Sequence, residues 1–366
     1  MPSRLRRFCL WTLVFAAVLL VVSEVYLRMR GYSPKPFLHG QPLSDSECRS
    51  PQYIVGERRL HPLLGWTSPE GQIMPTEGCR EAATVLADGR RRSYSADRPR
   101  TKRGVALLGC SFTYGTGVAD SDTFAWRLNE RYPELTFDNF GVEGYSADQC
   151  LLLMQRLLEE PQAISAEVAD TPYELFIYSG IYDHLFRNRA YNTFFLSDGR
   201  MFVYPPAGSG HVFSPRLYES YWYGEDRLAS LYFWHRLQIS SYMKYNELLR
   251  DKVIMKRQDS SWELMAEIVA AMNQLAAERG ARFACVGMDV PFCASMKNRL
   301  ADKDISFIDA TLMGRDHPEC FNKVRNRFAH PNAAGHSYFA ERIADWIDRV
   351  RYFSGSPSQS TVLLKP

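Results

Sequence analysis

The sequence predicts an α/β protein, a three-layer α/β/α sandwich on a parallel five-stranded sheet, preceded by an N-terminal transmembrane helix. Short apolar runs typical of buried parallel strands alternate with segments of helical periodicity, and one long apolar run lies near the N-terminus. Strands that alternate with helices join in parallel, with helices on both faces of the sheet. The five strand-like runs are residues 104–108, 135–140, 173–179, 282–286 and 305–308.

Helix starts are indicated by capping-box patterns, in which a serine is followed three residues later by glutamine or glutamate. Ser146 with Gln149 precedes an apolar helical segment, and Ser260 with Glu263 repeats the pattern further along the chain. Each pair predicts a helix that begins immediately after its serine. A last helix is expected over residues 333–353.

The long apolar run covers residues 8–27 and is interrupted only by Ser23 and Glu24. A helix needs about 20 residues to cross a bilayer, so this run is just long enough. A cleaved signal peptide and a buried N-terminal helix are the alternatives, but no small-residue cleavage site follows the run. We predict an uncleaved anchor. Three arginines precede it, which favours a single-pass protein of the bacterial inner membrane with the rest of the chain on the periplasmic side.

Four regions are expected along the chain. Residues 1–30 form the anchor, residues 31–103 an extension of short strands and turns, and residues 104–353 the α/β domain. Residues 354–366 form a flexible tail. Within the domain, residues 190–245 form an aromatic-rich insertion that is too long for a simple connection. Its rings either pack a small core of their own or offer a surface for a sugar or an acyl chain.

Composition and charge limit the kinds of molecule that the protein is expected to bind. With 46% hydrophobic and 23% charged residues among 366, the chain is typical of a globular protein and not of a disordered one. A formal net charge of +3 is too small to indicate a nucleic-acid partner. The basic residues crowded between positions 90 and 103 are expected to be solvated, and not to bind a specific anion.

Seven of the eight cysteines lie beyond the predicted anchor, which is consistent with an oxidising compartment. The sequence contains no CxxC pair, so a zinc ribbon or a thioredoxin-like redox centre is not expected. Cys48 with Cys79 and Cys293 with Cys320 are the candidate disulfides.

The candidate chemistry begins where the first core strand ends. Residues 109–115 read GCSFTYG, and their small side chains let the backbone turn sharply and present Ser111. Sites in open α/β sheets form at the carboxyl ends of strands, and amides at the start of the following helix suit an oxyanion. A bound phosphate is the alternative, although the segment lacks the GxxxxGK[ST] pattern of a P-loop.

Several segments resemble those of SGNH hydrolases, the GDSL-like esterases. Residues 109–117 (GCSFTYGTG) resemble the GDSFTxGxG first block, residues 139–145 (NFGVEGY) the second block, and residues 330–336 (HPNAAGH) the HPNxxGH block. Residues 61–66 (HPLLGW) and 88–90 (DGR) resemble segments that precede the core in anchored bacterial members. The resemblance covers roughly residues 60–350.

This resemblance implies a flavodoxin-like sheet and an acyl-transfer site. Ser111 would be the nucleophile and His330 the base that removes its proton. The backbone amides of Ser111 and Gly144 would form the oxyanion hole.

The chain departs from the family pattern at its first and third blocks. Cys110 stands where the first block usually has aspartate. In the third block, normally GxND, residues 180–184 read GIYDH, so Tyr182 replaces the asparagine of the oxyanion hole. The hydroxyl of Tyr182 or the ring of His184 is a candidate substitute donor, and the alternative is that both residues have only a structural role.

A third departure concerns the partner of the histidine. Arg327 stands three residues before His330, where the family places the triad aspartate. A carbonyl oxygen or a remote carboxylate such as Asp183 is then expected to orient His330, which would give a Ser–His dyad.

These residues predict an esterase that releases an acyl group from a simple ester or from an acylated glycan of the cell envelope. If a sugar hydroxyl replaced water, the same site would make an O-acyltransferase for an exopolysaccharide. A degenerate domain that binds glycan or lipid through the aromatic insertion is the non-enzymatic alternative. No cofactor is implied, and the spacing of His184, His330 and His336 does not match a metal motif. No pattern specifies an oligomeric state.

Overall fold

The structure is a computed structural model. It describes residues 3–30, 54–55, 58–61, 64–73, 83–188, 258–312, 314–324 and 327–350. The predicted aromatic insertion at 190–245 and the predicted tail at 354–366 lie outside the described residues.

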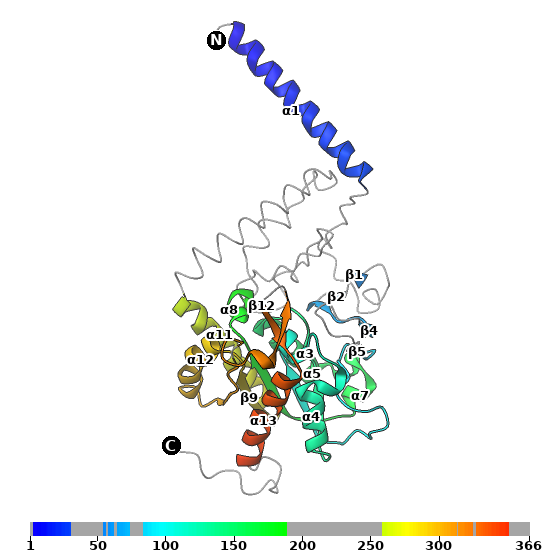
Figure 1. Ribbon diagram of the computed structural model, residues 1–366, viewed down its shortest axis with the longest axis vertical. Helices are drawn as coiled ribbons and strands as arrows, with labels where there is room; N and C mark the ends of the chain where they lie inside the picture. The colour runs from blue at the N-terminus through cyan, green and yellow to red at the C-terminus, as the bar shows by residue number, and fades with distance from the viewer. Residues whose placement is uncertain are drawn as a thin grey trace.

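Figure 1 shows the chain as a ribbon. Five parallel strands form its central sheet, in the order β10-β9-β8-β6-β7. Their bounds are β6 Gly104–Leu108, β7 Thr136–Asn139, β8 Tyr173–Gly180, β9 Arg282–Gly287 and β10 Ser306–Asp309. In chain order the strands run 2-1-3-4-5 across the sheet, which is the flavodoxin-like, doubly wound arrangement. The predicted five-stranded parallel sheet is therefore confirmed, and each strand lies where an apolar run predicts it.

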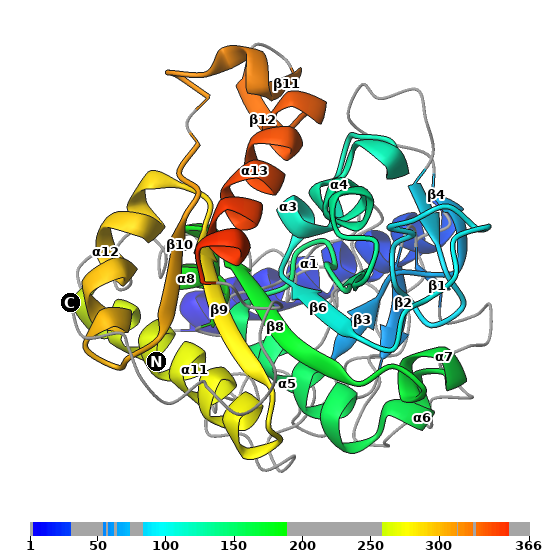
Figure 2. The ribbon, with the colours of Figure 1, turned by 90° about the horizontal axis from the view of Figure 1, so that it is seen from below.

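Helices cover both faces of this sheet, which completes the predicted three layers (Figure 2). On one face lie α5 Ala147–Glu159, α11 Gln258–Glu278 and α12 Val290–Ala301, and on the other lie α4 Phe124–Arg131 and α13 Ala333–Arg349. Alternate residues of each strand point to opposite faces. In β6, Ala106 and Leu108 thus pack against the first helix group, whereas Val105 and Leu107 pack against the second.

The remaining elements are short. Before the domain come β1 Ile54–Val55, β2 Arg58–His61, β3 Gly65–Thr67, β4 Gly71–Ile73 and β5 Ala83–Val85. Within it lie α3 Ser111–Tyr114, the 3-10 helix η2 Asp120–Asp122, α6 Pro161–Ile164, α7 Ala166–Ala169, α8 Asp183–Phe186, the 3-10 helix η6 Pro318–Cys320, β11 Phe321–Val324 and β12 Arg327–Pro331. Strands β1, β2 and β3 form one antiparallel sheet, and β4 pairs with β5.

One of the two capping boxes is confirmed. Ser146 is the N-cap of α5, and its backbone N–H donates to Gln149 Oε1 at 3.2 Å. The prediction for Ser260 is wrong, because the described part of α11 already includes Gln258 and Ser260 lies inside the helix. Serine followed by glutamate is compatible with the interior of a helix as well as with its start, so the pattern alone does not locate the first turn.

The basic stretch before β6 is not uniformly solvated, contrary to expectation. The side chains of Arg90 and Arg91 are about 1% exposed. Arg90 Nη1 lies 2.6 Å from Asp138 Oδ1, and Arg91 donates to the carbonyl oxygens of Tyr114 at 2.8 Å and Val118 at 2.6 Å. A guanidinium can be buried where carboxylates and carbonyls satisfy its N–H groups, and such partners cannot be read from a run of arginines.

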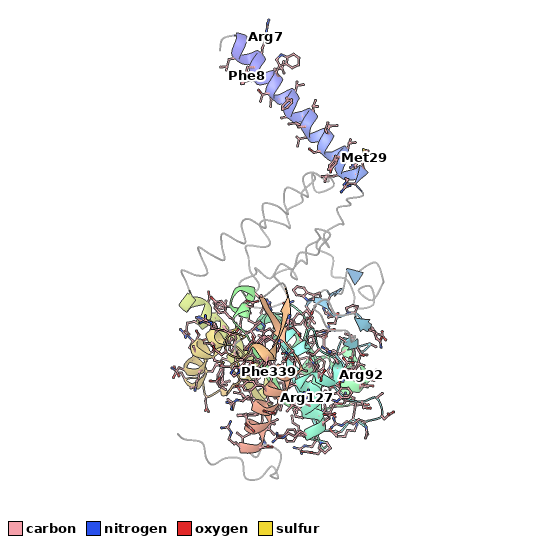
Figure 3. The ribbon with its side chains drawn as sticks, viewed as in Figure 1. Arg7, Phe8, Met29, Arg92, Arg127 and Phe339 are labelled. Atoms are coloured by element: carbon pink, nitrogen blue, oxygen red, sulfur yellow. The ribbon has the colours of Figure 1, made fainter. Side chains whose placement is uncertain are left out.

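Helix α1, Ser3–Met29, contains the apolar segment Arg7–Met29, whose mean hydropathy reaches 2.3 and none of which is buried inside the protein (Figure 3). Among the described residues, it is the one helix long and apolar enough to cross a membrane. Glu24, which interrupts the run, pairs with Arg28 one turn later at 2.7 Å.

The suggested disulfide between Cys293 and Cys320 is wrong, because both cysteines are free thiols. Cys293 lies on α12 and Cys320 at the end of η6, and sequence spacing does not reveal how such elements are placed. Cys48 and Cys79 lie outside the described residues.

Candidate active site

Ser111 lies where the order of the strands reverses. Strand β6 is fully buried between β7 and β8, and the chain leaves it through Gly109 and Cys110 to begin α3 at Ser111. A Cβ atom on Gly109, whose φ is +159°, would lie 2.1 Å from Thr113 Oγ1. Only glycine therefore permits this tight turn. Ligands of doubly wound sheets bind at this switch point, and Ser111 is 7% exposed there.

The second block packs against the short helix that Ser111 begins. Asn139, the last residue of β7, donates from Nδ2 to the carbonyl oxygen of Thr113 at 2.9 Å and accepts the Gly141 N–H at 2.9 Å. A Cβ on Gly141 would lie 2.3 Å from the backbone nitrogen of Tyr114, so the two segments touch backbone to backbone. Gly144 follows in the left-handed region with a φ of +81°.

His330 reaches the same region from the C-terminal end of the domain. It lies on β12, and its ring packs edge-on against Phe112, the residue after Ser111, with centroids 5.7 Å apart. The side chain of Asn332 then caps α13 by accepting the N–H groups of Ala334 and Gly335. The HPN segment thus ends a strand and starts a helix, which holds His330 beside α3.

The His330 ring contacts Phe112, the residue next to Ser111, and among the described residues no hydrogen bond joins His330 to Ser111. The side-chain contact of Ser111 Oγ is with Cys110 Sγ, at 4.0 Å. Burial raises the pKa of the Cys110 thiol, so the residue in the place of the family's aspartate is neutral. Catalytic hydrogen bonds are often long in a substrate-free site.

The third block follows β8. The contacts of its side chains indicate that they have structural roles. The Tyr182 ring packs against Trp262, with centroids 6.0 Å apart, and its backbone N–H donates to Asp289 Oδ2 at 2.7 Å. His184 is fully buried and bonds to the hydroxyl of Tyr178 through Nδ1. Burial, with a smaller effect from the positive charge of Arg187, lowers the pKa of His184 well below its usual value, so the ring is neutral.

Asp183 is not bonded to His330. Its largely exposed carboxylate instead accepts Arg187 Nη2 at 3.2 Å. Arg187 Nη1 also donates to the carbonyl oxygen of Tyr145 at 3.1 Å, so this guanidinium joins the second block to the third. The sequence carries no signal for that link, because a single arginine after a short helix matches no motif.

His336 belongs to the core. It lies on α13 and stacks on Phe124, and its Nδ1 accepts the backbone N–H of Phe124 at 3.3 Å. Burial lowers the pKa of His336 to about 3, aided by the positive charges of Arg91 and Arg127. Among the described residues, no group of three or more histidine, cysteine, aspartate or glutamate side chains could hold a metal ion.

Comparisons with solved structures give matches of low identity and low TM-score. No protein-family model and no curated protein matches the chain. A lipolytic protein of the G-D-S-L family from Veillonella parvula is 11% identical with a TM-score of 0.35, and the match covers 68% of this chain and 99% of that one. The esterase EstA from a Pseudoalteromonas species is 12% identical with a TM-score of 0.36, covering 68% of this chain and 98% of that one.

An acetyl xylan esterase from Butyrivibrio proteoclasticus is also similar, at 11% identity and a TM-score of 0.35, covering 70% of this chain and 66% of that one. Likeness at these values does not identify a reaction. The chemistry is therefore inferred from the residues of this chain.

Proposed function

We propose that the protein is a membrane-anchored serine esterase of the SGNH type, in which Ser111 attacks the carbonyl carbon of an ester. The observation that carries the proposal is the position of Ser111 at the switch point of the sheet, on a turn that only Gly109 permits. The second block and β12 pack against the same short helix. The second block and the segment of His330 therefore both contact the short helix that Ser111 begins, which supports the proposal.

The reaction follows from the roles of these groups. His330 removes the proton of Ser111 as Oγ forms a bond to the carbonyl carbon, and the carbonyl oxygen becomes an oxyanion. Collapse of this intermediate breaks the ester C–O bond, and protonated His330 gives the proton to the departing alkoxide. Water, deprotonated by His330, then attacks the acyl carbon, the bond from that carbon to Ser111 Oγ breaks, and His330 returns the proton to Oγ as the acid is released.

Two backbone amides are proposed to stabilise the oxyanion. Ser111 is the first residue of α3, and the first N–H groups of a helix have no acceptor within it. The Gly144 N–H belongs to the second block, which packs on that helix. We do not assign a donor role to His184, which is buried and bonded to Tyr178, and the packed ring of Tyr182 also favours a structural role.

His330 is proposed to act in a pair with Ser111, without a carboxylate at the position three residues earlier. Arg327 occupies that position, and residues 320–330 contain no aspartate or glutamate. Asp183, the remote candidate, is paired with Arg187. A group other than these carboxylates then orients the ring.

The anchor and its flanking charges define the proposed location. Helix α1 would cross the bacterial inner membrane with its arginine-rich start in the cytoplasm, which puts the esterase domain in the periplasm. The substrates available there include O-acetylated glycans of the cell envelope. An acylated glycan is therefore the proposed natural substrate class.

The proposal is tested with nitrophenyl acetate, nitrophenyl octanoate and a fluorophosphonate probe that labels activated serines. Wild-type protein should hydrolyse at least one ester and react with the probe, whereas Ser111→Ala should lose both properties with an unchanged melting temperature. Ser295→Ala, a serine of α12, is the control and should retain both. Wild-type protein that neither hydrolyses esters nor binds the probe would point to a binding domain and overturn the proposal.

A further inference from the structure

The indole of Trp66 is hydrogen-bonded to the segment that supplies the proposed oxyanion hole. Trp66 lies on β3, before the α/β domain, and is fully buried. Its Nε1–H donates to the carbonyl oxygen of Glu143 at 2.9 Å, across 77 positions of sequence. That carbonyl belongs to the peptide group between Glu143 and Gly144, and the N–H of the same peptide group is the Gly144 amide.

We propose that Trp66 is a positioning residue, which orients the Gly144 N–H toward the oxyanion by holding the opposite end of its peptide group. The inference rests on the proposed function, because it requires Gly144 to be an oxyanion donor. Because Trp66 lies before the α/β domain, the inference extends the proposed active site to a residue outside that domain.

The physical basis is the planarity of the peptide bond. In a trans peptide group the C=O and the N–H lie in one plane and point in opposite directions, so fixing the oxygen also fixes the N–H. Gly144 adopts a φ of +81°, and glycine lets a neighbouring peptide group rotate more freely than other residues do. A hydrogen bond to the carbonyl oxygen opposes this rotation. It also polarises the peptide group, which strengthens the N–H as a donor.

Trp66 is itself held in place. The hydroxyl of Tyr145 donates to the carbonyl oxygen of Trp66 at 2.6 Å, and the two rings pack edge to face with centroids 5.8 Å apart. Two residues earlier, the carbonyl oxygen of Leu64 accepts Gln149 Nε2 at 2.6 Å. Both partners belong to the second block or to the helix that follows it. The indole is therefore fixed relative to the peptide group that it contacts.

The test is Trp66→Phe, which keeps an aromatic ring but removes the N–H donor. Loss of a whole oxyanion donor lowers kcat by about 10²–10³-fold, so a misoriented donor should lower kcat by about tenfold. KM for a nitrophenyl ester should change less than twofold, because the carbonyl oxygen is uncharged in the bound substrate. The inhibition constant of phenylboronic acid should rise about tenfold, since its serine adduct carries a tetrahedral anion in the hole.

Trp346→Phe is the matched control, because it makes the same change at a buried tryptophan of α13 that packs on the opposite face of the sheet. It should leave kcat and the boronate inhibition constant within twofold of wild type. Tyr145→Phe provides a milder second variant if Trp66→Phe does not fold. It removes the hydroxyl that holds Trp66 and should produce a smaller change of the same kind, in kcat and boronate affinity but not in KM.

The inference is overturned if Trp66→Phe, or Tyr145→Phe where the first variant is unfolded, keeps wild-type kcat and boronate affinity. Equal losses in Trp66→Phe and Trp346→Phe would also overturn it, because they would reflect general destabilisation. These outcomes differ from a failure of the proposed function. In that case the wild-type protein itself would show no hydrolysis, or Ser111→Ala would remain active.

Discussion

Arg90 and Asp138 form an ion pair inside the protein, with Nη1 2.6 Å from Oδ1 and both side chains 1% exposed. Arg100 and the hydroxyl of Tyr173 also bond to the Asp138 carboxylate, each at 2.7 Å. Burial alone would raise the pKa of Asp138, but the two arginines outweigh it and hold the pKa below its usual value. Asp138 lies on the edge strand β7, next to Asn139, so this cluster fastens the chain before the domain to the strand that leads into the second block.

Replacing Asp138 with asparagine should strongly destabilise the fold, because it leaves the buried Arg90 cation without its main counter-charge. Breaking a buried pair from one side costs about 3–5 kcal/mol in the free energy of unfolding. Urea unfolding at pH 7 measures the loss. The control is Glu263→Gln, which breaks the exposed pair with Arg299 at 2.8 Å and should cost less than about 1 kcal/mol. Similar small losses in both variants would contradict the prediction.

Asp289 should make the stability of the protein depend on pH. Its carboxylate accepts the N–H groups of Tyr182 at 2.7 Å and Phe292 at 2.9 Å, but burial, with some repulsion from Asp183, raises its pKa to about 6. The folded protein thus binds this proton more tightly than the unfolded chain, whose pKa is near 3.8. The free energy of unfolding should therefore fall as pH rises from about 4 to 6.

Replacing Asp289 with asparagine removes this titration. Each unit of pKa shift corresponds to about 1.4 kcal/mol, so the wild-type protein should lose roughly 1–3 kcal/mol across the window relative to the variant. Melting temperatures of both proteins between pH 4 and 7 provide the measurement. Parallel pH profiles for the two proteins would show that Asp289 does not titrate there.

Gly141→Ala should separate the second block from α3. The new Cβ would lie 2.3 Å from the Tyr114 nitrogen and 2.7 Å from the Thr113 carbonyl carbon, and backbone atoms cannot move aside as a flexible side chain can. We expect kcat/KM for ester hydrolysis to fall at least tenfold, together with a lower melting temperature.

Gly280→Ala is the control, since its Cβ would meet nothing within 4 Å. It should cost about 1 kcal/mol through its positive φ and leave kcat/KM unchanged. Unaltered hydrolysis by Gly141→Ala would contradict the proposed site.

Removal of residues 1–30 should release the protein from membranes without changing its fold. None of the apolar segment of α1 is buried inside the protein, so the domain loses no packing with it. Full-length protein should remain in the membrane pellet after carbonate washing, whereas protein that begins at Gly31 should be soluble with the same melting temperature. Full-length protein that carbonate extracts would rule out a spanning anchor.

Several features of the fold and the site follow from local patterns in the sequence. The apolar run of β6, the capping box at Ser146 and the glycines at 109 and 141 are all visible there. Each reflects a constraint that acts within a few residues, such as burial on both faces of a strand or the absence of room for a Cβ atom. For this reason the five strands and the three layers could be predicted from the sequence, whereas Ser111 is identified as the candidate nucleophile by the resemblance of its segment to the SGNH first block.

Other features depend on contacts between segments that are far apart along the chain. The burial of Arg90 requires Asp138, 48 positions away, and the bond of Trp66 to Glu143 spans 77 positions. Nothing local distinguishes a buried arginine from a solvated one, or an indole N–H that meets a carbonyl from one that meets water. The energies of these groups are determined by which partner the packing brings to them. Only the tertiary structure decides that Trp66 holds the peptide group of Gly144, and that Cys293 and Cys320 remain free thiols.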